Sequence, residues 1–185
     1  MGRVTVAPDA FGYVEFDAAR IAAVAEKVLD DLGLDLPLRV EVDESSPLGR
    51  ARVASVEPLV VAVEGGAFED PRRFRQLSEP GVADTLGRLL LRVRDRLDPG
   101  FGEPGPDDAI PLPHSTAWDA YCIGRLARLG YRGQRQRRLY HFRNRHGFTD
   151  AADAAFAALW DGDGLRWADV VRLSDEARRA LDAAG

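Results

Sequence analysis

The chain has 185 residues and a net charge of −5, and 45% of its residues are hydrophobic. A hydrophobic share of this size is ordinary for globular proteins and supports a folded core. The single cysteine, Cys122, excludes an internal disulfide framework and a zinc site made of several cysteines. The first residues lack the apolar run of a signal peptide, and no apolar stretch approaches the roughly 18–20 residues needed to cross a bilayer. We therefore expect a cytoplasmic protein without a membrane partner.

The first half of the chain shows the periodicities of one helix followed by several strands. Apolar residues recur at helical spacing over residues 17–32, with Asp17 as the expected N-cap and Gly33 as the stop. Alternating or unbroken apolar runs then predict strands at residues 38–44, 50–56 and 59–63.

A short helix over residues 71–77 and a longer amphipathic helix from Pro80 to Leu97 complete this half. Proline is tolerated at a helix start because its missing N–H has no partner there in any case. Residues 99–113 hold five of the eleven prolines, which is typical of a linker or a long surface loop.

The second half has only helical patterns. Thr116 and Asp119 resemble a capping box that opens a helix ending near Gly130. Two further helices are expected at residues 150–160 and 166–183.

These elements predict an α+β fold with a small mixed or antiparallel sheet and helices in the N-terminal half and an all-helical C-terminal half. We divide the chain into an α+β domain (1–98), a Pro/Gly-rich linker or loop (99–115) and a helical region (116–185). We expect the helical region to pack on the first domain as one unit.

The helix after the sheet resembles the corresponding helix of the zincin-like (minimal metallopeptidase) domain, over about residues 14–100. In that family this helix carries HExxH, in which two histidines bind zinc. Here Asp84, Thr85 and Arg88 occupy the places of the His, Glu and His, while Gly87 and the apolar frame agree with the family pattern. The resemblance implies a scaffold without its zinc, because Arg88 puts a cation at the metal site. We expect neither a metal nor another cofactor.

Residues 120–148 contain eight arginines and no acid, so the rest of the chain carries −13 against a total of −5. Such asymmetry indicates an anionic partner, or contact with the chain's own acids, such as Asp30, Asp31, Glu41, Asp43 and Glu44. The chain has 24 arginines and one lysine, which we interpret mainly as the signature of a GC-rich genome. The residues expected to bind an anion or a partner are Arg132, Arg135, Arg137, Arg138, Arg143 and Arg145.

All three histidines also fall within residues 114–146. His141 and His146 are five residues apart, which points them to different faces of a straight helix and makes them a poor metal pair. We expect both to be surface or capping residues. Cys122 lies on the apolar face of its helix, so we interpret it as a buried structural residue rather than a nucleophile.

The pattern is compatible with three kinds of function. The first is a non-catalytic interaction or scaffold protein whose Arg-rich surface docks an acidic protein or another copy of itself. The second is an enzyme for a small anionic substrate, with His114, Asp119, His141 and His146 as candidate catalytic residues and Arg138 binding the substrate. The third is a nucleic-acid-binding module, in which arginines would meet phosphates and aromatic rings would stack on bases. The acidic pI of about 5.3 disfavours it.

Overall fold

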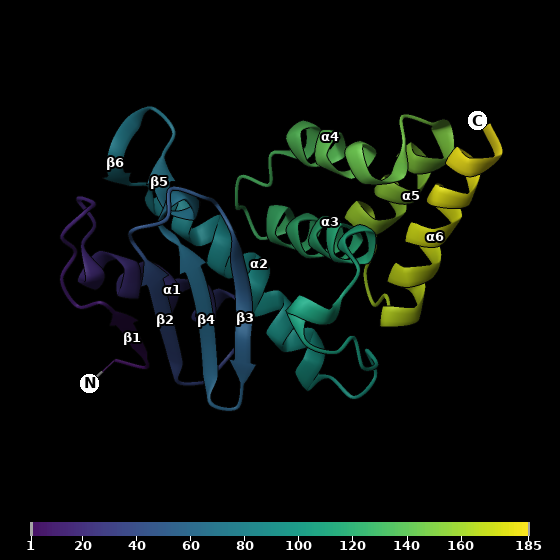
Figure 1. Ribbon diagram of the computed structural model, residues 1–185. Helices are drawn as coiled ribbons and strands as arrows, with labels where there is room; N and C mark the ends of the chain where they lie inside the picture. The colour runs from purple at the N-terminus through teal and green to yellow at the C-terminus, as the bar shows by residue number, and fades with distance from the viewer. Residues whose placement is uncertain (1, 185) are drawn as a thin grey trace. The chain divides into compact units, whose positions relative to one another are not determined.

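The computed structural model describes residues 2–184 and shows an α+β fold, as the sequence predicts. It divides into two compact units, Met1–Val93 and Arg94–Gly185, which we call the sheet unit and the helical unit. The first contains the strands together with α1 and most of α2, and the second contains helices and loops (Figure 1).

The sheet unit is built on a four-stranded mixed sheet in the order β1-β2-β4-β3. Strands β1, β2 and β4 are parallel, and β3 pairs antiparallel with β4 across an irregularity near Val53. Their bounds are Val4–Ala7 (β1), Leu38–Asp43 (β2), Ala51–Val56 (β3) and Leu59–Glu64 (β4). In Figure 1, helices α1 (Ala18–Asp31) and α2 (Glu79–Leu97) lie behind this sheet.

Local sequence explains most of these elements. The Asp17 carboxylate accepts hydrogen bonds from the backbone N–H groups of Ala19 and Arg20, so the predicted N-cap of α1 is confirmed. Gly33 has a φ of +65°, which L side chains rarely adopt, and the helix ends before it. Strand β2 alternates strictly between buried and exposed residues, because its apolar side chains face the core and its charged ones face away.

The prediction of a short helix at residues 71–77 is wrong. This segment belongs to a hairpin of β5 (Glu69–Asp70) and β6 (Arg73–Leu77), which follows the short 3-10 turn η1 (Gly65–Ala67). The Asp70 carboxylate accepts a hydrogen bond from the Arg72 N–H and closes the turn around Pro71. A seven-residue segment gains little from helix formation, since nucleation is costly, and strand pairing satisfies its backbone instead.

As far as residue 184, the helical unit contains four helices after the end of α2. A 3-10 turn, η2 (Asp107–Ala109), precedes α3 (Leu112–Arg128), α4 (Arg135–His146), α5 (Asp150–Asp161) and α6 (Trp167–Ala184). Each of these four helices contacts the other three.

The start of α3 differs from the prediction. The helix begins at Leu112, and the Thr116 hydroxyl donates back to the Leu112 carbonyl inside the first turns. Thr116 and Asp119 therefore do not form a capping box. The sequence Leu112-Pro113 starts the helix instead, because proline is tolerated in the first turn.

Among residues 2–184, no helix combines the length and apolar character needed to cross a membrane.

Candidate functional site

The eight arginines of residues 120–148 divide into four that contact neighbouring helices within the helical unit and four that lie on or just before α4. Arg125, on α3, is internal: its guanidinium donates two hydrogen bonds of 2.7 Å to the Asp95 carboxylate. The Trp118 indole N–H donates to the same carboxylate at 2.8 Å. Arg125 also stacks on the Tyr121 ring, with 3.8 Å between the guanidinium carbon and the ring centroid. All four residues are buried.

Arg128 and Arg143 fasten α5 to its neighbours. Arg128 donates to the carbonyls of Trp160 and Gly162, each at 2.7 Å, and so satisfies carbonyl groups at the C-terminal end of α5. The Arg143 Nε donates to the Asp153 carboxylate at 2.7 Å. This ion pair lowers the pKa of Asp153, mainly through the hydrogen bond.

Arg135 is exposed, but its guanidinium lies over two rings of α5. The distances from its guanidinium carbon are 5.5 Å to the Phe156 centroid and 6.0 Å to the Trp160 centroid. Arg125, Arg128, Arg135 and Arg143 thus hold the helical unit together. The acids they meet are Asp95 and Asp153, within that unit, rather than the acids expected from the first half of the chain.

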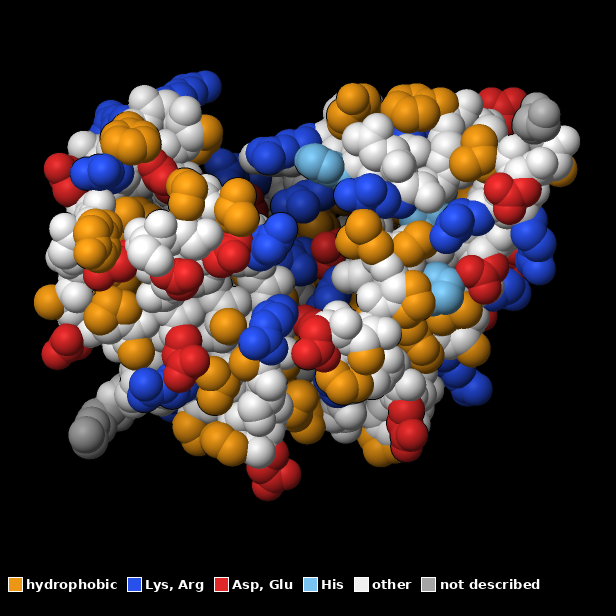
Figure 2. All heavy atoms as spheres, in the orientation of Figure 1, with side chains coloured by type: hydrophobic (Ala, Val, Ile, Leu, Met, Phe, Trp, Pro, Cys, Tyr) orange, Lys and Arg blue, Asp and Glu red, His pale blue; other side chains and the backbone are white. Residues whose placement is uncertain are grey.

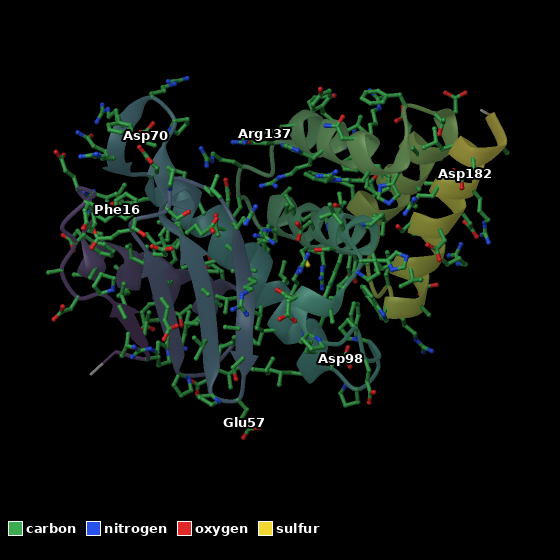
Figure 3. The ribbon with its side chains drawn as sticks, viewed as in Figure 1. Phe16, Glu57, Asp70, Asp98, Arg137 and Asp182 are labelled. Atoms are coloured by element: carbon green, nitrogen blue, oxygen red, sulfur yellow. The ribbon has the colours of Figure 1, made fainter. Side chains whose placement is uncertain are left out.

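The remaining four arginines lie on α4 or just before it. Figure 3 shows Arg137 extending from the N-terminal end of this helix, where the Gln134 side chain accepts a hydrogen bond from it at 3.3 Å. Figure 2 shows several basic side chains gathered at the surface along α4. Arg132, Arg137 and Arg145 are exposed and Arg138 is half-buried.

The N-terminal turn of α4 is electrostatically unusual. Helix starts favour acids and a capping side chain, because the unpaired N–H groups carry partial positive charge. Here the N-cap residue Gln134 is left-handed with a φ of 51° and gives no side-chain cap, and the first turn contains no acid. Arg135, Arg137 and Arg138 stand there instead. A cation at this end of a helix opposes the macrodipole by about 0.3–1 kcal/mol.

A cleft with a volume of about 210 Å³ lies between α3 and α4. Arg138, His141 and Arg145 line one wall; they are three and seven residues apart and therefore share one side of α4. We call it the α3–α4 cleft, and its lining residues are Leu112, Thr116, Asp119, Ala120, Arg138, His141 and Arg145.

The cleft is positively charged even though His141 is neutral at pH 7. Partial burial lowers the pKa of His141, and the charges of Arg138, Arg137 and Arg145 lower it further. With His141 neutral, the two lining arginines outweigh Asp119 and leave a net charge of +1.

The other two histidines lie outside this cleft. His114 contacts α6, where its Nε2 is 2.7 Å from an Asp175 carboxylate oxygen, and its ring meets the edge of Trp167. Of the candidate catalytic residues, Asp119 and His141 thus line the same cleft together with Arg138, and His114 does not line it.

His146 is fully buried, so the prediction of a surface or capping residue is wrong for it. Its Nδ1 lies 3.0 Å from the Phe142 carbonyl, which requires a proton on Nδ1, and its Nε2 accepts from the Ser174 hydroxyl at 2.8 Å. The ring stacks on Phe142 with 3.8 Å between centroids. Burial lowers the pKa of His146 to about 4. A neutral core histidine of this kind joins α4 to α6. Cys122 is likewise buried, as predicted.

This histidine makes stability depend on pH. A histidine in the unfolded chain has a pKa of about 6.5, whereas His146 in the native chain has a pKa of about 4. Between these two pH values the unfolded chain therefore binds a proton at His146 and the native chain does not. Stability is therefore complete above pH 6.5 and is lost as the pH falls toward 4. We expect the protonation equilibrium of His146 to lower the free energy of unfolding by about 2 kcal/mol between pH 7.5 and pH 5, and urea unfolding at the two pH values measures this change. A His146→Gln variant should lose this part of the pH dependence; an unchanged slope would contradict it.

The sequence analysis did not predict the buried Asp95–Arg125–Trp118 network. Asp95 lies one turn after Leu91 on an amphipathic helix, and this spacing was the available signal that its carboxylate is buried.

No known protein family, curated protein or solved structure compared with the chain gives a significant match. The zincin-like resemblance therefore stays a prediction. Within residues 2–184, no three His, Cys, Asp or Glu side chains are grouped so as to hold a metal ion.

Proposed function

We propose that this is a non-catalytic interaction protein and that α4 docks an acidic segment of a partner protein. The docking surface is the basic face of α4, which we define as Arg137, Tyr140, His141 and Arg145. The observation that carries the proposal is that Arg137 lies one helical turn from Tyr140, and His141 one turn from Arg145, so that basic side chains flank an exposed aromatic ring on α4. Among residues 2–184, neither Arg137 nor Arg145 forms an ion pair with an acid.

The aromatic part of the surface supports the same function. Tyr140 is 57% exposed and Phe148, just beyond the helix, is 63% exposed. Their rings meet edge to face with 6.0 Å between centroids, so they form a small apolar platform beside the arginines. Tyr and Arg are enriched among the residues that contribute most to protein–protein binding.

The charge pattern favours a carboxylate-bearing partner over a nucleic acid. The chain outside residues 120–148 carries −13, so it would repel a long polyanion, whereas a short acidic segment meets only the local positive potential. An anion near the N-terminal turn of α4 would also offset the opposition between its arginines and the helix dipole.

Charge reversal on the basic face tests this proposal. We expect Arg137→Glu/Arg145→Glu to weaken binding of a short oligo-glutamate peptide at least about tenfold, since each interface arginine contributes more than about 1 kcal/mol. Fluorescence anisotropy at low salt measures the dissociation constant. The matched control is Arg178→Glu/Arg179→Glu, which changes the net charge equally on the exposed side of α6.

If both double variants weaken peptide binding equally, the loss of affinity comes from the change in net charge alone. That result would contradict a specific docking surface on α4. A single-stranded oligonucleotide that binds more tightly than the peptide at low salt would favour the nucleic-acid function instead.

The second candidate is an enzyme that acts on a small anionic substrate. It is favoured by one observation, that Asp119 and His141 line the same cleft as two arginines. A histidine can transfer protons while arginine holds the anion. Turnover of an anionic ester that is lost in His141→Gln would support this function, and its absence across ester classes would count against it.

A further inference from the structure

We propose that the α3–α4 cleft binds one phosphoryl group, carried by a phosphorylated side chain of the acidic partner. The inference rests on the proposed docking function and specifies the group that anchors the partner.

The geometry of the cleft suits one compact anion. Arg138, His141 and Arg145 present nitrogen donors from successive turns of α4 on one side of the cavity. The other side comes from α3, where Leu112 and Ala120 supply apolar surface and Thr116 and Asp119 supply polar groups. A volume of about 210 Å³ holds a phosphoryl group with a few waters, since a water occupies roughly 30 Å³ of liquid. Arginine is suited to this ligand because its planar fork can donate two parallel hydrogen bonds to phosphate oxygens.

The charge of the cleft distinguishes a phosphoryl group from a carboxylate. With neutral His141 the lining residues sum to +1, which one carboxylate already balances. A phosphorylated side chain carries about −1.5 to −2 at pH 7. The cleft balances that charge only when His141 is protonated, which raises the lining charge to +2. A phosphoryl group therefore draws a proton onto His141.

The surroundings of His141 make this proton uptake favourable. Arg137, Arg138 and Arg145 face it from α4 and at present oppose its protonation, Asp119 faces the cleft from α3, and the Tyr140 ring lies 6.4 Å away. A dianion between the arginines removes much of their repulsion. The pKa of His141 should then rise on binding, and binding should tighten as the pH falls from 7.5 toward about 6, the second pKa of the phosphoryl group.

Asp119 provides a second way to test the site. It is the only acid among the lining residues, and its carboxylate repels a bound dianion. Replacement by Asn keeps the shape and removes the charge. We expect Asp119→Asn to bind the phosphoryl group more tightly, a gain that loss of a merely structural contact would not give.

The experiment compares three probes by NMR titration of the His141 imidazole: a phosphoserine peptide, the same peptide with Glu in place of phosphoserine, and inorganic phosphate. We expect the phosphopeptide to bind at least about tenfold more tightly than the Glu peptide. The pKa of His141 should rise by about one unit or more at saturation, the scale at which two ionisable groups are strongly coupled.

Two substitutions separate the cleft from the wider surface. Arg145→Gln should remove the preference for the phosphopeptide. His141→Gln should retain weakened binding but lose its pH dependence. Arg137→Gln is the matched control, because Arg137 lies on the basic face but does not line the cleft: it should weaken both peptides and keep the preference.

The outcomes distinguish this inference from the proposed function. Equal affinities for the two peptides, with no change in the pKa of His141, would overturn the phosphoryl site and leave acidic docking intact. If neither peptide binds, both proposals fail. If inorganic phosphate binds with proton uptake while the phosphopeptide is excluded, the site serves a free anion, and the partner-borne group is disproved.

Discussion

Replacing Asp95 with Ala is expected to destabilise the helical unit by about 3–5 kcal/mol, because Arg125 would remain buried without its carboxylate. Asp95 is 5% exposed and Arg125 is 8% exposed, so water reaches neither group freely. Both carboxylate oxygens accept from Arg125, and one also accepts from the Trp118 indole. Thermal unfolding followed by tryptophan fluorescence should show a fall in Tm of more than about 10 °C, since each kcal/mol shifts a domain of this size by about 4–8 °C.

The double variant Asp95→Leu/Arg125→Leu is the control for this result. It removes both charges together and should be more stable than Asp95→Ala, because a buried ion pair contributes little beyond the desolvation of its two partners. A single variant as stable as the wild type would contradict the buried network. The order of the three stabilities thus reports whether the cost comes from an uncompensated charge.

Gly124→Ala is expected to destabilise the helical unit by about 3 kcal/mol, through a clash between α3 and α5. A Cβ at this position would lie 2.1 Å from the Trp160 carbonyl oxygen and 2.8 Å from its carbon. These are backbone atoms, so the helices themselves would have to separate. In a free helix the same change would stabilise by about 1 kcal/mol, and the expected sign is therefore opposite to helix propensity.

Urea unfolding measures the effect of Gly124→Ala, and Gly12→Ala provides the comparison. A Cβ at Gly12 would meet nothing within 4 Å, so that variant should unfold within about 0.5 kcal/mol of the wild type, as surface substitutions usually do. Equal stabilities for the two variants would mean that α3 and α5 do not approach closely at Gly124.

Local sequence patterns were sufficient to predict a helix or strand where a single residue fixes the end of the element, or where one face of the element is buried. The Asp17 cap, the left-handed Gly33 and the strict alternation of β2 each act over a few residues, and the prediction agreed with the structure there. The hairpin of β5 and β6 was mistaken for a helix because its stability comes from pairing between strands. Strand β1 was not predicted; it pairs with β2, more than thirty residues away along the chain.

The candidate site was only partly predictable for the same reason. Composition identified the Arg-rich segment, because an excess of charge is visible without a fold. The sequence does not show which arginines stabilise the helical unit, because that depends on which helix each one faces. The four that do so are Arg125, Arg128, Arg135 and Arg143. The joining of Asp119 to His141, and the burial of His146 against Ser174, depend on how α3, α4 and α6 pack.

The sequence by itself determined the α+β class, the helical second half and the concentration of positive charge in residues 120–148, since periodicity and charge are properties of short segments. Only the tertiary structure decided what that charge does. Four arginines stabilise the helical unit because its packing places acids, carbonyls and rings within their reach. Arg138 and Arg145 instead line a cleft with His141, because α3 and α4 pack with a gap between those turns.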